Sequence, residues 1–301
     1  MAKVVLIGCG NVGMSYAYSL VNQKTRVSEL VLVDLNKEKV EGEALDLMHA
    51  VSFAPNKMNI KAGDYYDCNN ADIVCICAGR NQEQGETRLD LVKKNYQVFK
   101  SIISEINKTN FNGIYLIATN PLDVMTYITQ KLSGFPKNKV IGSGTILDTA
   151  RLRYLISEKT KINPKSIHGF VIGEHGDSEF IPWSNTLIGL DKANKFLTKN
   201  DMSKITYDVR NSAYDIINKK GSTCYGIGIC LTKITNAILN DSNKILTVSS
   251  YNEDYDIYIG EPTILGKSGV KKVLKLNLSD DDKIKFEESV NAIQTVINTL
   301  N

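Results

Sequence analysis

Four short apolar runs, rich in β-branched residues, recur through the first half of the chain. They do not alternate with polar residues, so they predict strands that are buried on both faces of a parallel sheet. Between two of them, apolar residues recur at steps of four and three, which predicts a helix with one buried face. The runs are Lys3–Gly8, Glu29–Asp34, Asp72–Cys77 and Gly113–Ala118, and the helical stripe is Val92, Tyr96, Phe99, Ile103 and Ile106. Strands that alternate with helices in this way indicate a doubly wound α/β sheet.

After about residue 145 the pattern changes and predicts a mixed α+β segment. We expect a helix from Ile146 to about Lys159, a strand over Ser166–Gly173 and then a glycine-bounded turn. The last helix is the clearest, because Ser279 can cap it and Asp280–Asp282 favour its positive end. Its apolar stripe is Phe286, Val290, Ile293, Ile297 and Leu300. With no repeat or linker between the halves, we predict two packed domains, 1–143 and 144–301, with a cleft between them.

The composition is that of an ordinary globular chain, with 43% apolar and 23% charged residues among 301. Its 36 basic and 33 acidic side chains leave a net charge of +3, which gives no global field for holding a nucleic acid or an anionic membrane. No segment approaches the roughly 20 apolar residues that span a bilayer, and the N-terminus does not have the pattern of a signal peptide. The six cysteines are scattered without a CxxC pair or a disulfide framework. We therefore predict a cytoplasmic protein with free thiols and no nucleic-acid or membrane partner.

A glycine-rich loop follows the first predicted strand and opens a helix. In such a loop the first glycine permits a tight turn, the second lets a pyrophosphate approach the backbone, and the third lets the helix pack on the strand. The second strand ends at Asp34, about 20 residues further on, where a carboxylate binds a ribose 2′-OH and repels a 2′-phosphate. The loop is Gly8-Cys9-Gly10-Asn11-Val12-Gly13. The pattern predicts a Rossmann-type site for NAD rather than NADP; the alternative is that Asp34 only caps the following helix.

Four further segments carry polar residues in a specific order. They are Ala78–Leu91 (AGRNQEQGETRLDL), Thr119–Asp123 (TNPLD), Gly142–Tyr154 (GSGTILDTARLRY) and Ile172–Ser178 (IGEHGDS). Together with the glycine loop, they resemble the L-lactate/malate dehydrogenase family in order over nearly the whole chain. The resemblance implies an NAD-binding Rossmann domain followed by a mixed α+β catalytic domain, and reversible hydride transfer between NADH and a small 2-keto acid.

Three residues suit the proton and anion chemistry of such a reaction. His175 lies in a glycine-flanked turn, and a histidine titrates near neutrality, so it can give and take a proton. Asp148 and Arg151 lie three apart on one predicted helix and therefore share a face. By themselves these residues could form a polar loop and a surface salt bridge. The resemblance implies that His175 is the proton donor and acceptor, that Asp148 orients it, and that Arg151 grips the substrate carboxylate in a bidentate manner.

The resemblance assigns further roles around the cleft. The polar segment after Gly79 is similar to the mobile lid of the family, which closes over substrate and excludes water. Within it, Arg88 matches the arginine that polarises the substrate carbonyl, and Arg80 matches an arginine near the cofactor phosphates. Asn120 matches a residue that hydrogen-bonds substrate and cofactor, and Thr223 matches a threonine that lines the substrate pocket. No metal ligand set is implied.

The lid residue Gln82 bears on the choice of substrate. The malate branch of the family typically has an arginine here, which pairs with the second carboxylate of oxaloacetate. A neutral glutamine would leave that carboxylate buried without a partner, so the sequence favours pyruvate and L-lactate. Two alternatives remain: a malate or longer-chain L-2-hydroxy-acid dehydrogenase, and an NAD-binding regulator that has lost its chemistry. A methyltransferase would explain only the glycine loop and Asp34.

The resemblance also bears on assembly and regulation. It implies a homo-oligomer, either a tetramer or a dimer; the first strand begins almost at the start of the sequence, so we expect no N-terminal arm of the kind that animal members use in tetramer contacts. Arg153 and His168 fall where bacterial members bind fructose bisphosphate across a subunit interface. Members without this regulation carry the same residues, so both an effector site and its absence stay open.

Overall fold

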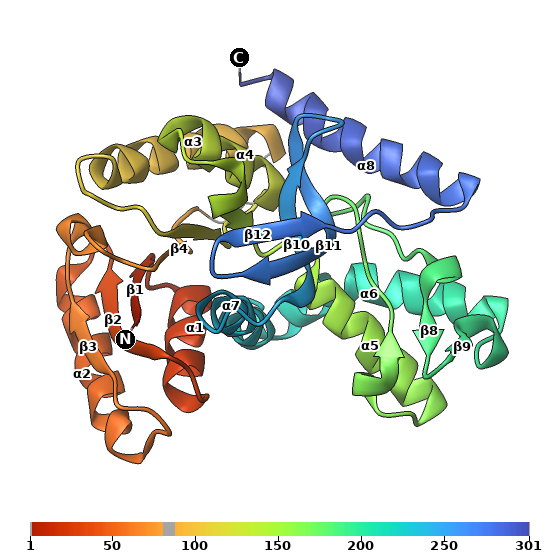
Figure 1. Ribbon diagram of the computed structural model, residues 1–301, viewed down its shortest axis with the longest axis horizontal. Coiled ribbons are helices and arrows are strands. Elements are labelled where there is room, and N and C mark those ends of the chain that lie inside the picture. Colours follow the sequence, from red (N-terminus) through yellow and green to blue (C-terminus); the bar gives the residue numbers. More distant parts are fainter. Residues whose placement is uncertain (1, 81–87, 301) are drawn as a thin grey trace.

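One large sheet forms the centre of the computed structural model, which describes residues 2–80 and 88–300 (Figure 1). Its strands are β1 (Ala2–Ile7), β2 (Val27–Val33), β3 (Asn59–Ala62), β4 (Ile73–Ile76), β5 (Ile114–Ile117), β6 (Val140–Gly142), β10 (Lys244–Asn252), β11 (Ile257–Gly266) and β12 (Gly269–Val273). Their order across the sheet is β12-β11-β10-β6-β5-β4-β1-β2-β3. Strands β1 to β6 are parallel and lie in the order 3-2-1-4-5-6, which is typical of a doubly wound dinucleotide-binding sheet. The predicted Rossmann-type sheet is confirmed.

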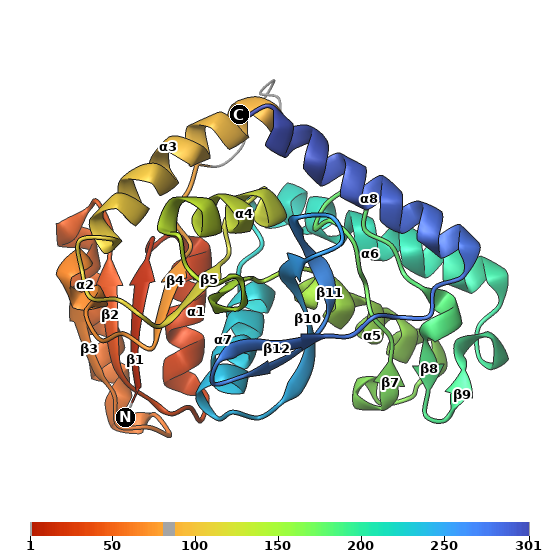
Figure 2. The ribbon, with the colours of Figure 1, turned by 45° about the horizontal axis from the view of Figure 1, so that its top comes forward.

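Helices cover both faces of this sheet. They are α1 (Asn11–Asn22), α2 (Lys37–Ala50), α3 (Arg88–Ile106), α4 (Leu122–Ser133), α5 (Ile146–Thr160), α6 (Lys199–Lys220), α7 (Tyr225–Leu239) and α8 (Asp280–Asn298). Apolar residues of α1, α2 and α7 pack on one face, and those of α3, α4 and α8 pack on the other. Figure 2 shows α3 and α8 along the upper edge of the molecule, over α4. Among residues 2–80 and 88–300, no helix has the length and apolar character needed to cross a membrane.

A smaller unit packs beside α5 and α6, at the end of the molecule opposite β1, β2 and β3 (Figure 1). Its three-stranded sheet is formed by β7 (Ile167–His168), β8 (Leu187–Ile188) and β9 (Asp191–Lys192). A third apolar cluster joins this sheet to α5 and α6. Single turns of 3-10 helix lie at Val51–Phe53, Tyr65–Cys68, Lys137–Lys139, Pro164–Ser166, Trp183–Asn185 and Ala193–Lys195.

Most elements expected from the sequence are present. The four apolar runs coincide with β1, β2, β4 and β5, and the periodic stripe lies on α3, where Val92 and Phe99 are fully buried. The helix expected from Ile146 is α5. Ser279 caps α8 as predicted, because its hydroxyl oxygen accepts a hydrogen bond from the backbone N–H of Asp282 at 3.3 Å.

The strand expected over Ser166–Gly173 is wrong in its extent. Only Ile167–His168 forms β7. Further along, the backbone of Val171 bonds to α5 and its N-cap residue instead of a neighbouring strand. Its N–H donates to Thr149 Oγ1 at 2.9 Å, and its carbonyl accepts from Thr145 Oγ1, the N-cap hydroxyl, at 2.6 Å. The segment therefore lies along α5.

Three strands of the second half extend the sheet of the first half in antiparallel directions. Strand β10 pairs with β6 through Ser249 and Gly142. A Cβ atom at Gly142 would lie 2.8 Å from the Cβ of Ser249, so a glycine is needed where the strands meet. This continuation joins the two halves of the chain in one sheet.

Helices α1 and α7 approach each other at Gly228, and this contact yields a prediction. A Cβ atom at Gly228 would lie 2.7 Å from the backbone carbonyl of Ser15, which cannot move aside as a flexible side chain can. Gly228→Ala should therefore lower the free energy of unfolding by about 1–3 kcal/mol, measured by urea denaturation. Gly226→Ala is the control in the same helix, since its Cβ meets only the tip of Leu147 at 2.8 Å. Equal stability of the two variants would contradict this account of the α1–α7 contact.

Candidate active site

The glycine loop between β1 and α1 has the geometry of a dinucleotide site. Gly8 has a φ of +98°, and a Cβ at this position would lie 2.3 Å from the backbone nitrogen of Ala78. A Cβ at Gly13 would lie 2.0 Å from the carbonyl oxygen of Gly8, whereas one at Gly10 would meet nothing within 4 Å. Gly8 and Gly13 are thus required by packing, and Gly10 leaves open backbone at the start of α1. Val12 lies half-buried in this first turn. This opening fits a pyrophosphate, as NAD requires.

Asp34 follows β2 and turns toward the same loop. Its Oδ2 accepts a hydrogen bond from the backbone N–H of Cys9 at 2.7 Å. The cap of α2 is Asn36, whose side chain accepts from the backbone N–H of Lys39. Asp34 therefore lies at the glycine loop rather than at the cap, which is where a ribose-binding carboxylate is expected.

Asn95 joins two of the predicted segments, and sequence reasoning missed it. Its Oδ1 accepts from the backbone N–H of Arg80 at 2.8 Å, and its Nδ2 donates to the carbonyl of Asn120 at 2.8 Å. Asn95 is fully buried on α3, while Arg80 and Asn120 are exposed at the ends of β4 and β5. The sequence did contain a signal for this residue: Asn95 is a polar residue three positions after Val92, on the apolar face of the predicted helix, where a buried hydrogen-bonding role is expected.

The segment with Thr223 lies next to the glycine loop. It connects α6 to α7, and the side chain of Asn11 donates to Ser222 Oγ at 3.2 Å. Thr223 is half-buried there. The fold thus brings a predicted pocket residue beside the predicted cofactor loop, although the two are distant in sequence. Gln82 lies outside the described residues, as does the side chain of Arg88, the residue at which α3 begins.

His175 is held in a short loop that is closed at its base. Ile172 and Phe180 exchange two backbone hydrogen bonds of 3.0 Å, and Gly173 and Gly260 of β11 exchange two more of the same length. Gly173 has a φ of +98°, a conformation that favours glycine. The turn between these anchors presents the His175 side chain, which is 26% exposed.

Asp148 bridges His175 and Arg151. Its Oδ2 lies 2.9 Å from His175 Nδ1, and its Oδ1 accepts from Arg151 Nη1 at 2.6 Å. The Asp148 side chain is only 2% exposed and that of Arg151 is 13% exposed, so this is no surface salt bridge. The structure thus brings together the three residues to which the sequence analysis assigned proton and carboxylate chemistry.

The charges of this cluster determine how its members titrate. Burial by itself lowers the pKa of His175, but the charge and hydrogen bond of Asp148, with Glu179 and Asp123, outweigh it and raise the pKa to about 9. Burial acts on Asp148 in the opposite direction and raises its pKa, yet His175 and Arg151 outweigh burial and hold the pKa below its usual range. Asp148 is therefore ionised and His175 protonated at neutral pH.

A second buried carboxylate, Asp123, fixes the backbone of the histidine loop. Its Oδ2 accepts from the backbone N–H of His175 at 2.7 Å, and its Oδ1 accepts from Ser249 Oγ at 2.5 Å. Burial raises the pKa of Asp123 to about 6, although both hydrogen bonds oppose this. Asp123 and Ser249 were not identified as site residues from the sequence, although Asp123 ends the TNPLD segment.

Arg153 and His168 form a separate group with its own contacts. Arg153 Nε and Nη2 donate to the carbonyl of Gly169 at 3.4 and 3.3 Å, and its guanidinium lies 5.9 Å from the ring centre of Phe170. Burial lowers the pKa of Arg153. His168 is exposed on β7, next to the residue that Arg153 binds.

Comparison with known proteins gives consistent matches over both halves. Residues 2–142 match the family model described as lactate/malate dehydrogenase, NAD binding domain, and residues 145–301 match its alpha/beta C-terminal domain. The chain is 50% identical to L-lactate dehydrogenase 1 of Bacillus cereus, covering 97% of this chain and 96% of that protein. It superimposes on a lactate dehydrogenase from a Medee basin deep-sea metagenome library with a TM-score of 0.96 and 46% identity, covering 99% and 98% of the two chains. The minor L-lactate dehydrogenase of Enterococcus mundtii, in its ligands-bound form, gives a TM-score of 0.97 at 41% identity, with 100% and 98% covered.

The bridge from Asp148 to His175 yields a prediction about titration. Asp148→Asn removes the charge that favours the imidazolium, so the pKa of His175 should fall from about 9 to or below its ordinary value of 6.5. The measurement is an NMR titration of labelled histidine, and the chain has only three histidines to assign.

The same change should alter stability with pH. A raised pKa means that protonation of His175 stabilises the fold fully below about pH 6.5 and that this contribution is lost as pH rises toward 9. In Asp148→Asn this loss of stability should disappear. Asp177→Asn, which removes an exposed carboxylate from the same loop, is the control. An unchanged His175 pKa in Asp148→Asn would contradict the assignment.

Proposed function

This chain belongs to the lactate/malate dehydrogenase family, and on that premise we propose that it is an L-lactate dehydrogenase in which His175 carries the proton. Its cofactor is NAD, which matches the geometry of the glycine loop. The observation that carries the proposal is the bridge made by Asp148. One buried carboxylate binds both the proton carrier His175 and the anion-binding Arg151, one through each of its oxygens.

Each residue of the cluster then has a distinct task. The guanidinium of Arg151 binds Asp148 through Nη1, and its remaining donors form a fork for the substrate carboxylate. His175 is bonded to Asp148 through Nδ1, so its Nε2 is the atom that gives a proton to the carbonyl oxygen of pyruvate. Bound NADH supplies the hydride to the neighbouring carbon. Lactate oxidation uses the same groups in reverse, with His175 taking the proton.

Other parts of the proposal come from the family resemblance. The resemblance implies that Arg88 polarises the carbonyl, that the neutral Gln82 suits a substrate with a methyl group, and that the lid segment excludes water. Asn120 and Thr223 contact the substrate, and Arg80, Asn11 and Asp34 contact the cofactor. The NAD-binding domain covers residues 1–143 and the catalytic domain residues 144–301.

The substrate proposal is tested by comparing keto acids. With NADH, we expect pyruvate to give a kcat/KM well above those of oxaloacetate and 2-oxoisocaproate. Gln82→Arg should raise the ratio of kcat/KM for oxaloacetate to kcat/KM for pyruvate by a factor of ten or more, because the arginine gives the second carboxylate of oxaloacetate a partner. Each factor of ten corresponds to about 1.4 kcal/mol. Steady-state NADH oxidation measures both.

The outcomes separate the alternatives. A wild-type preference for oxaloacetate or 2-oxoisocaproate would favour the malate or longer-chain enzyme. Binding of NADH without turnover of any of the three acids would favour the inactive regulator. An unchanged preference in Gln82→Arg would mean that residue 82 does not face the substrate.

Assembly and location belong to the same proposal. We propose a homo-oligomer, a dimer or a tetramer, since α2, the 3-10 turn Val51–Phe53 that follows it, and α7 expose large apolar side chains. Leu45 and Phe53 are 61% and 96% exposed, and Tyr225 and Ile229 are 72% and 55% exposed. A cytoplasmic location accords with the six cysteines, all of which are free.

We also propose Arg153 and His168 as an effector site for fructose bisphosphate. Two such basic pairs facing each other across a subunit interface would bind two phosphate groups and stabilise the active assembly. Fructose bisphosphate should then lower the KM for pyruvate severalfold in the wild type and leave it unchanged in Arg153→Gln. No change in the wild-type rate at low pyruvate would remove the idea.

A further inference from the structure

Glu179 is a buried carboxylate that the proposed reaction does not use. It lies four residues after His175 and is 5% exposed. Its Oε2 is 3.9 Å from His175 Nδ1, the nitrogen that Asp148 binds at 2.9 Å. One ligand atom from each of Asp148, His175 and Glu179 falls within 4.8 Å of the other two. Two carboxylates therefore face one edge of the imidazole.

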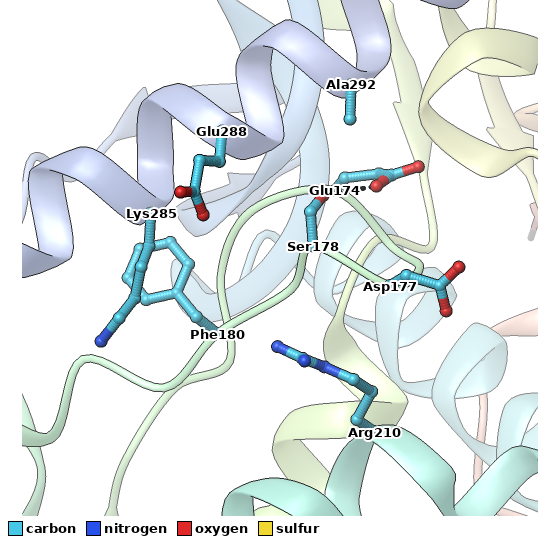
Figure 3. A pocket seen from close by; sticks show the side chains of 8 residues that line it. All are labelled: Glu174, Asp177, Ser178, Phe180, Arg210, Lys285, Glu288 and Ala292. Carbon is cyan, nitrogen blue, oxygen red and sulfur yellow. Dashed lines mark hydrogen bonds between the residues drawn. The ribbon is translucent and has the colours of Figure 1, made fainter.

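The backbone of Glu179 is held from two directions. Its N–H donates to the carbonyl of Gly176 at 3.3 Å, and its own carbonyl accepts from Arg210 Nη2 at 2.9 Å. Figure 3 shows the outer side of this loop, where a cavity of about 450 Å³ lies between Arg210 of α6 and Lys285 and Glu288 of α8. Glu174, Asp177 and Ser178 of this loop thus line the outer cavity, whereas the Glu179 carboxylate lies 3.9 Å from the imidazole.

Charged groups face this pair from several elements. They are Asp148 and Arg151 of α5, Asp123 of α4 and Arg210 of α6. Glu174 of the same loop acts on Asp123, and the Cys230 thiol of α7 is influenced by Asp148 and Arg151. Burial raises the pKa of Cys230 to about 12, so this thiol is uncharged near neutrality.

Asp148 and Glu179 differ in how well their charge is compensated. Asp148 bonds both Arg151 and His175. Glu179 approaches His175 at a longer distance; burial and the charge of Asp148 raise its pKa well above the usual range, although His175, Arg151 and Arg210 oppose this. Two carboxylates so close to each other lose their protons in separate steps. Glu179 consequently still holds its proton at pH values where Asp148 is already ionised, and loses it in a later step.

We propose that Glu179 is a positioning residue that, once ionised, holds the proton on His175 and so extends pyruvate reduction to higher pH. Asp148 supplies the constant negative charge, and Glu179 adds a second one only when alkaline conditions would otherwise remove the proton. This inference rests on the proposed role of His175 as the proton carrier.

The test is the pH profile of Glu179→Gln in both directions of the reaction. Glutamine resembles the protonated carboxyl, so at pH 6 the kcat/KM for pyruvate should stay within about twofold of the wild type. The falling alkaline limb should move down by roughly one pH unit, which lowers kcat/KM at pH 9 about fivefold. Lactate oxidation needs neutral His175, so its rising limb should move down by the same amount.

Control variants separate this role from a structural one. Glu288→Gln makes the same chemical change in the outer cavity and should leave both limbs in place. Glu179→Asp keeps a titrating carboxyl and should restore part of the alkaline limb. Profiles of Glu179→Gln that superimpose on the wild type, or that fall equally at every pH, would overturn the inference. Absence of pyruvate reduction in the wild type would instead overturn the proposed function.

Discussion

The arrangement of the candidate site depends on Asp148, a buried carboxylate that has lost its contact with water. Asp148 is almost fully excluded from solvent, and an ionised group in that position is tolerated only when charged hydrogen bonds replace its water. Arg151 and His175 supply them, one to each oxygen. Because the same carboxylate holds both partners, the spacing between the His175 imidazole and the Arg151 guanidinium is determined by a single side chain. The electrostatic compensation that keeps Asp148 ionised also keeps His175 protonated at neutral pH.

This arrangement needs a rigid support, and the large sheet provides it. Asp123 binds the backbone of His175 and the hydroxyl of Ser249, so α4, β10 and the histidine loop are linked at one point. The paired backbones of Gly173 and Gly260 attach the same loop to β11. The strands that the second half adds to the sheet thus support the His175 loop, whereas the glycine loop, Asp34, Arg80 and Asn120 follow the carboxyl ends of β1, β2, β4 and β5.

The carboxylates around His175 are compensated to different degrees. Three carboxylates, Asp148, Asp123 and Glu179, influence His175, and each is compensated differently: by two cations, by a hydroxyl and a backbone N–H, or by a more distant approach to the imidazole. Unequal compensation separates the pH ranges in which they ionise, since burial favours the neutral acid and cations favour the carboxylate.

The sequence by itself determined those features whose cause is local. Apolar runs predicted β1, β2, β4 and β5, glycine spacing predicted the tight loop at Gly8, and a capping serine predicted the start of α8; in each case neighbouring residues carry the physical cause. Asp148 and Arg151 could be placed on one face because helical periodicity operates over three residues. Only the tertiary structure decided that β10 to β12 join the sheet, that Val171 bonds to α5 rather than to a strand, and that Asp123, Asn95 and Glu179 converge on the predicted site. Those contacts join residues up to 126 positions apart, as Ser249 and Asp123 are, and no local pattern records which distant backbone will satisfy a buried polar group.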